Sequence, residues 1–206
     1  MAQIQIGILG AARIVPNALI APARYVPEVH IAGIAARDPA KAQRFAQKHK
    51  IPKVFQSYDA LLADPSIDAI YIPLPNGLHG AWTIKALEAG KHVLCEKPFA
   101  ANADEAQRVA DVAAMHPDRV VMEAFHYRYH PLAAKMQAIL ASGELGTLRR
   151  LESWMCFPLP LMNDIRYQFS LAGGATMDAG CYAIHVLRLL AGAEPEVVAA
   201  RATLAR

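Results

Sequence analysis

The stretch IQIGILGAAR, residues 4–13, decides the fold, because it leads an apolar strand directly into a glycine turn. The isoleucines that alternate over residues 4–8, together with Leu9, predict a short strand that Gly10 closes. Glycine at such a turn lets the backbone approach a pyrophosphate that rests on the amides of the following helix. A plain tight turn is the alternative, since G-x-x-G-x-A is not the full G-x-G-x-x-G pattern. The place of this loop, first in the chain between a strand and a helix, favours nucleotide binding.

Strands and helices alternate over residues 1–124. Capping residues predict helix starts at Asp38, Ser57 and Asn102, the last with the Glu of a capping box three residues later. Alternation of this kind predicts a parallel, doubly wound sheet, so we expect an α/β fold with a Rossmann-type domain over residues 1–124. After the strand described above, strands are expected at residues 29–36, 54–55, 68–72, 92–95 and 119–124.

The pattern changes after residue 145. TLRRLESWMCF (147–157) and PEVVAARATLA (195–205) alternate like strands of an antiparallel sheet, and a helix is predicted between them over 177–190. We therefore expect residues 125–206 to form a second domain of α+β type with an open antiparallel sheet. One helix and two strands cannot close a sheet with a buried face, so the chain is predicted to be a fragment of a longer protein.

Composition narrows the class of protein. The 206 residues are 54% hydrophobic and 19% charged with a net charge of +3, which is typical of a soluble globular protein. No basic stripe with interleaved aromatic residues is present, so nucleic acid is not an expected partner. The three cysteines follow no metal-ligand spacing, and no apolar run approaches the ~20 residues of a membrane span. We expect a cytoplasmic protein that does not bind a membrane.

The end of the second predicted strand bears on the choice of cofactor. NAD sites place an acid there to bind the ribose hydroxyls, but this chain has Ala36 followed by Arg37. A guanidinium can hold a 2′-phosphate through two hydrogen bonds. Asp38 could serve the ribose instead, although helix capping explains it without a ligand. The sequence therefore favours NADP, with NAD as the alternative.

Two loops follow the fourth and fifth predicted strands, YIPLPNGLHG (71–80) and CEKP (95–98). Ligands of an open parallel sheet bind beyond the carboxyl ends of its strands, so both loops should face one crevice. Asn76 offers an amide to cofactor hydroxyls, whereas His79 is better explained as the start of a helix. Lys97 precedes a proline, which restricts its backbone, and we expect its ammonium at the nicotinamide.

A third group of candidates lies in GGATMDAGCYAIHVLRLL, which begins at Gly173. On a helix, Asp178, Tyr182 and His185 share one face. A histidine among apolar residues is more often a hydrogen-bonded core residue, and we favour that reading for His185. Gly173 and Gly174 indicate that the chain passes close to another group.

These motifs together resemble the glucose–fructose oxidoreductase / inositol dehydrogenase (Gfo/Idh/MocA) family. The resemblance covers the G-x-x-G-x-A turn, LPNGLH, EKP, FHYRYHP (125–131) and GGATMDAGCY. Many members carry His at the position of Tyr182, and tyrosine there is more similar to the dihydrodiol and D-xylose dehydrogenase branch. The resemblance implies a catalytic pair of Lys97 and Tyr182, with Asp178 lining the site. It implies cofactor contacts at Gly7, Gly10, Ala12, Arg13, Arg37, Pro75, Asn76, His79, Glu96, Lys97 and Arg128.

The implied activity is hydride transfer between NADP(H) and a secondary alcohol or hemiacetal carbon of a sugar, polyol or dihydrodiol. A non-catalytic NAD(P)-binding regulator of the same fold is the alternative. A metal-dependent hydrolase using Glu123, His126 and His130 is disfavoured, because their spacing is not that of metal ligands. The resemblance also implies a homo-oligomer formed through the sheet of the second domain.

Overall fold

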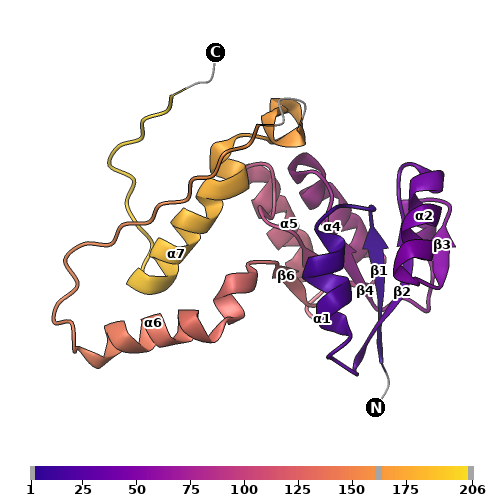
Figure 1. Ribbon diagram of the computed structural model, residues 1–206, viewed down its shortest axis with the longest axis horizontal. Helices are drawn as coiled ribbons and strands as arrows, with labels where there is room; N and C mark the ends of the chain where they lie inside the picture. The colour runs from indigo at the N-terminus through magenta and orange to yellow at the C-terminus, as the bar shows by residue number, and fades with distance from the viewer. Residues whose placement is uncertain (1–2, 161–163, 204–206) are drawn as a thin grey trace. The chain divides into compact units, whose positions relative to one another are not determined.

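Six parallel strands form one sheet, which confirms the Rossmann-type prediction. The computed structural model describes residues 3–160 and 164–203. The sheet has the order β3-β2-β1-β4-β5-β6 (Figure 1). The strand order reverses between β1 and β4, and ligands of such sheets bind at the carboxyl edge of this switch point. The strands are β1 (Ile4–Leu9), β2 (Val29–Ala35), β3 (Lys53–Phe55), β4 (Ala69–Ile72), β5 (His92–Cys95) and β6 (Val121–Glu123).

Helices cover both faces of this sheet. One apolar core packs η1 and α2 against Ile8 and Ile34, while the other packs α3 and α4 against Leu9 and Ile70. Neighbouring residues of a strand point to opposite faces, so each strand supplies both cores. The helices along residues 16–115 are η1 (Pro16–Ile20), α1 (Ala21–Ala23), α2 (Pro39–His49), α3 (Tyr58–Leu62), η2 (Asn76–Leu78), α4 (His79–Glu88) and α5 (Ala103–Met115).

The predicted caps fix the helix starts. Asp38, Ser57 and Asn102 each accept a hydrogen bond from the backbone N–H three residues on, at 3.1, 3.0 and 2.9 Å. The capping box differs in one bond: the Glu105 carboxylate accepts from the N–H of Ala101 instead of Asn102. The helices that link the strands therefore begin where local chemistry places them.

The chain divides into two units. Residues 1–124 with 160–178 form the first unit, and residues 125–159 with 179–206 form the second. The first division falls between residues 124 and 125, whereas segment 160–178, expected in the second domain, groups with the sheet. This segment contains η4 (Ile165–Tyr167), η5 (Phe169–Leu171) and the start of η6 (Thr176–Gly180). Its polar contacts with the loops of the sheet, described below, account for the difference.

The second unit is helical in its described residues, with η3 (His126–Tyr129), α6 (Pro131–Ser142) and α7 (Cys181–Ala191). The helix predicted over 177–190 is present, although its first turn is the π-helical η6. The two strand predictions are wrong: 147–157 and 195–203 carry no strand, and residues 204–205 lie outside the described residues. Alternation alone does not make a strand, because the backbone must pair with a neighbour. Trp154 is accordingly 83% exposed.

The helices are short. The longest in the described ranges, α5, has 13 residues. Within residues 3–160 and 164–203, no helix has the length and apolar character required to cross a bilayer.

Candidate cofactor and active site

The turn after β1 offers backbone donors at the carboxyl edge of the sheet. Gly10 has φ +102° and donates its N–H to the Ala35 carbonyl at 2.7 Å, which ties the turn to β2. Among the described residues, no hydrogen-bond acceptor lies against the N–H groups of residues 11–14, which include the predicted Ala12 and Arg13. Consecutive unpaired amides form a concave site that suits a phosphate group.

Gly7 has a packing reason of its own. It lies inside β1, and a Cβ atom there would stand 2.5 Å from Cδ2 of Leu61 in α3. The absence of a side chain is thus required by the contact between β1 and α3. A cofactor contact at Gly7 stays a prediction.

Arg37 and Asp38 follow β2, next to β1 in the sheet. The Arg37 side chain is exposed, and its backbone N–H bonds the Tyr58 hydroxyl. Burial raises the pKa of Tyr58, so this hydroxyl stays protonated. Asp38 accepts from the N–H of Lys41, as its capping role predicts. The guanidinium is thus exposed at this edge of the sheet, and its contact with a nucleotide stays a prediction.

His79 holds two loops together. It is 1% exposed, and its Nδ1 lies 2.6 Å from the Pro98 carbonyl oxygen while Nε2 lies 2.7 Å from that of Leu74. Burial lowers the pKa of His79, and both carbonyl bonds oppose that shift. Both ring nitrogens face backbone carbonyls and at least one N–H donates to them, which supports the structural alternative. Its cofactor contact stays a prediction.

Replacing His79 by Phe should destabilise the fold. The ring would be kept, but at least one of the carbonyls of Leu74 and Pro98 would lose its N–H donor, at a cost of about 1–3 kcal/mol. Urea unfolding followed by circular dichroism measures the change. His30→Phe, at an exposed position of β2, is the matched control and should change little. Equal stability of the two variants would show that the carbonyl bonds contribute nothing.

The loop after β4 also contacts segment 160–178. The Asn76 side-chain amide donates to the Ala172 carbonyl at 2.9 Å. A Cβ on Gly77 would lie 3.1 Å from the backbone of Leu171, so a larger residue would require the Leu171 backbone to shift by a few tenths of an ångström. Pro75 precedes this turn and caps η2. Residues far apart in sequence therefore meet at the predicted nucleotide edge.

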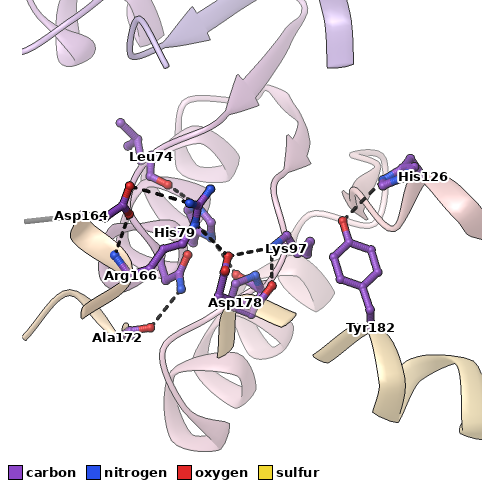
Figure 2. A network of polar contacts seen from close by, with 11 residues as sticks. Leu74, His79, Lys97, His126, Asp164, Arg166, Ala172, Asp178 and Tyr182 are labelled. Atoms are coloured by element: carbon purple, nitrogen blue, oxygen red, sulfur yellow. Dashed lines mark hydrogen bonds and ion pairs between the residues drawn. The ribbon is translucent and has the colours of Figure 1, made fainter. Parts of the chain in front are cut away.

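Lys97 lies after β5 and meets Asp178 of η6 (Figure 2). Its Nζ donates to the Asp178 carbonyl at 2.7 Å and lies 3.4 Å from Oδ1 of the same residue. The two side chains are only 15% and 16% exposed. The neighbouring Glu96 accepts from the Tyr71 hydroxyl at 2.6 Å, which fixes the start of this loop. Two predicted site residues, 81 positions apart, are thus brought together.

A run of charged residues extends from this contact, and sequence analysis missed part of it. Nε of Arg166 lies 3.2 Å from Oδ1 of Asp178, and its Nη1 lies 3.7 Å from Oδ2 of Asp164. The same Asp164 oxygen lies 3.2 Å from Nη2 of Arg13. We call Arg13, Asp164, Arg166, Asp178 and Lys97 the charge chain, whose last four members are labelled in Figure 2. Asp164 and Arg166 follow no periodic pattern that could have identified them.

The close approach predicted at Gly173 and Gly174 is to the backbone of this same segment. A Cβ on Gly173 would lie 2.6 Å from the Arg166 carbonyl oxygen and 2.8 Å from that of Gln168. The N–H of Gly174 donates to the Arg166 carbonyl at 2.7 Å. The paired glycines therefore fix the backbone that carries Arg166.

The second unit carries an aromatic cluster around Tyr182. The Tyr182 hydroxyl lies 3.5 Å from Nδ1 of His126. His185 stacks on Phe125 with ring centroids 4.1 Å apart and bonds the Tyr127 hydroxyl. Burial lowers the pKa of His185 and raises that of Tyr127, so both groups are neutral near pH 7. His185 is the hydrogen-bonded histidine that the sequence favoured.

The remaining predicted residues divide between the units. Arg128 is exposed in η3 of the second unit, together with Tyr182, while Lys97 and Asp178 belong to the first unit. Within the described ranges, no three His, Cys, Asp or Glu side chains gather as metal ligands would.

Two family models match the chain. Residues 4–125 match the model described as "Oxidoreductase family, NAD-binding Rossmann fold", and residues 133–206 match the "GFO/IDH/MocA C-terminal domain". A D-xylose 1-dehydrogenase (NADP(+)) of Haloferax volcanii is 47% identical over 194 residues, which are 94% of this chain and 59% of the relative. A trans-1,2-dihydrobenzene-1,2-diol dehydrogenase of Xenopus tropicalis is 35% identical and covers 96% of this chain and 60% of its own length.

Solved structures agree with these relatives. The crystal structure of KijD10, a 3-ketoreductase from Actinomadura kijaniata in complex with NADP and TDP-benzene, superposes with a TM-score of 0.86 at 33% identity. The match covers 92% of this chain and 57% of that one. The chain thus spans somewhat over half the length of the relatives it matches. By its sheet, its motifs and both family models, the chain belongs to the Gfo/Idh/MocA family of oxidoreductases.

Proposed function

We propose that the protein transfers a hydride between NADP(H) and a secondary alcohol or hemiacetal carbon of a sugar, polyol or dihydrodiol. The observation that carries the proposal is the contact between Lys97 and Asp178 at the carboxyl edge of the sheet, beside the predicted nucleotide loops. An ion pair with a purely structural role could lie anywhere in the fold, whereas this one lies at the edge where parallel sheets bind ligands. Two of the relatives named above act on D-xylose and on a dihydrodiol, as their names state.

The residues present fit a dinucleotide. The unpaired amides of residues 11–14 suit its pyrophosphate, and Asn76 lies on the neighbouring loop. Arg37, exposed at the end of β2, suits a 2′-phosphate, while Asp38 is occupied in capping its helix. The D-xylose dehydrogenase relative and the KijD10 complex are both associated with NADP by name. NADP is therefore the proposed cofactor, with NAD as the weaker candidate.

Replacing Arg37 by Ala should weaken binding of NADPH far more than binding of NADH. A lost charge-assisted contact costs about 1.5–3 kcal/mol, or about ten- to a hundredfold in affinity. Fluorescence titration of the nicotinamide measures both dissociation constants. Arg44→Ala, at an exposed position of α2, should leave both unchanged. Equal losses for the two cofactors in Arg37→Ala would contradict the NADP assignment.

Each residue then has a defined task. When bound, the nicotinamide ring accepts or returns the hydride at C4. Tyr182 takes the hydroxyl proton as the hydride leaves and returns it in the reverse direction. The Lys97 ammonium favours the phenolate form of Tyr182 and hydrogen-bonds the substrate oxygen. Asp178 holds the ammonium in place. Direct proton transfer to Lys97 is the competing route.

A substrate panel tests the activity. The full-length protein should change nicotinamide absorbance at 340 nm with at least one member of a set of pentoses, hexoses and dihydrodiols, and faster with NADP than with NAD. Tight NADP binding without turnover of any member would favour the non-catalytic regulator instead.

Location and assembly are also proposals. A cytoplasmic protein is supported by three cysteines that remain free, Cys95, Cys156 and Cys181. A homo-oligomer through the second domain is supported by exposed apolar side chains such as Trp154 and Val198 in segments 147–157 and 195–203. Light scattering of the full-length protein would measure the oligomeric state.

A further inference from the structure

We propose that Arg166 is a positioning residue for Lys97, acting through the Asp178 carboxylate. The inference rests on the proposed function, which gives the Lys97 ammonium its task at the substrate oxygen. It concerns a residue of η4 that lies on the far side of Asp178 from Lys97 (Figure 2).

The argument begins with a shared oxygen. Oδ1 of Asp178 lies 3.2 Å from Nε of Arg166 and 3.4 Å from Nζ of Lys97. The shorter contact of Lys97, at 2.7 Å, is with the Asp178 carbonyl. The guanidinium repels the ammonium while both are drawn to the same oxygen, so the net attraction on Lys97 is weaker than Asp178 would exert without Arg166. Arg166 therefore keeps the Lys97 ammonium on the carbonyl and prevents a closer ion pair with the carboxylate.

Backbone contacts and a second carboxylate hold Arg166 in this position. Its carbonyl accepts from Gly174 at 2.7 Å, and the Cα of Gly173 packs so closely that no side chain fits there. The guanidinium also reaches Asp164, which is 7% exposed and bonded to Arg13. A surface arginine would need neither the paired glycines nor a buried second carboxylate.

Loss of the Arg166 guanidinium should change the protonation of Lys97 in a predictable direction. Asp178 would then attract Lys97 without the opposing charge of the guanidinium, so the ammonium form becomes more favourable and its pKa rises. The charged or titratable groups near Lys97 include Glu96, beside it in the chain, and His79 of α4. Neither is altered by a change at Arg166, so the shift reports the guanidinium.

The first test requires no turnover. Competitive acetylation with acetic anhydride, followed by peptide mass spectrometry, measures the neutral amine fraction at Lys97. In Arg166→Met, the labelling rate at fixed pH should fall by about three- to tenfold, which corresponds to a pKa rise of about 0.5–1 unit. Arg119→Met, which removes an arginine paired with the exposed Asp118, should leave it unchanged.

Two further variants separate the effect of the charge from misfolding of Arg166→Met. Arg166→Gln removes the charge but keeps a hydrogen-bond donor, and it gives the same slower labelling if Arg166→Met fails to fold. Arg166→Lys keeps the charge and should return the rate to within about twofold of the parent. Parent-like labelling in the Met or Gln variant, or slow labelling in the Lys variant, overturns the proposal.

Kinetics of the full-length protein separate this inference from the proposed function. Arg166→Met should lower kcat and raise the apparent pKa of the pH–rate profile, with the KM for NADP unchanged within about twofold. If Arg166→Met matches the Arg119→Met control while Tyr182→Phe abolishes turnover, the positioning role is wrong and the function stands. If Lys97 labelling shifts as expected but the parent full-length protein turns over no member of the substrate panel, the positioning role stands and the proposed function is wrong.

Discussion

Tyr182→Phe is expected to lower turnover by about 10²- to 10⁴-fold, the range for loss of a general acid/base. The substitution removes only the hydroxyl, so the ring contact with Phe125 at 5.5 Å between centroids remains. NADPH affinity should stay nearly unchanged, because no cofactor contact is assigned to this hydroxyl. Steady-state kinetics and fluorescence titration of the full-length protein give both quantities.

Tyr129→Phe is the matched control for this substitution. Tyr129 is 62% exposed in η3 and has no role in the proposed mechanism, so its variant should keep parent turnover. Near-normal turnover in Tyr182→Phe would mean that Tyr182 only lines the site and does not transfer the proton. The proton would then have to pass through Lys97 or His185.

Lys97→Met should lower turnover by about 10²- to 10³-fold, as expected when one charged donor to the reacting oxygen is lost. Methionine keeps most of the length of the side chain without the charge. The apparent pKa of the pH–rate profile should rise, since the Tyr182 phenolate loses the neighbouring cation. Rates measured between about pH 6 and 10 show both changes.

Lys85→Met is the control, because Lys85 forms an exposed ion pair with Asp59 in a different part of the first unit. The double variant of Lys97→Met and Tyr182→Phe should be little worse than the poorer single one, since residues that act as a unit are not additive. Additive losses would mean that the two side chains act in separate steps.

Much of the first unit could be predicted because its signals are local. The strands are short and mainly apolar, and Asp38, Ser57 and Asn102 cap helices through bonds to residues three positions away. The parallel, doubly wound sheet follows from the alternation of strands and helices. These features require no knowledge of distant residues.

The charge chain could not be predicted, because its contacts join residues far apart in sequence. Arg13 and Asp164 are 151 positions apart, and Asp164 and Arg166 lie in short helical turns without hydrophobic periodicity. Gly173 did indicate a close approach, but the sequence could not say that the neighbour was the backbone of Arg166. For 147–157, alternation was present while strand pairing was not.

The two ends of the charge chain differ in how far their side chains are exposed to solvent. This difference determines how strongly dissolved ions act on each end. The Arg13 side chain is 81% exposed, whereas that of Lys97 is 15% exposed. Mobile ions screen exposed charges beyond about 8 Å at physiological ionic strength and reach buried pairs far less. Salt therefore weakens the contact of Arg13 with Asp164 more than the contacts of Lys97 with Asp178. A change of ionic strength can thus alter the exposed end of the charge chain without disturbing the geometry at the lysine.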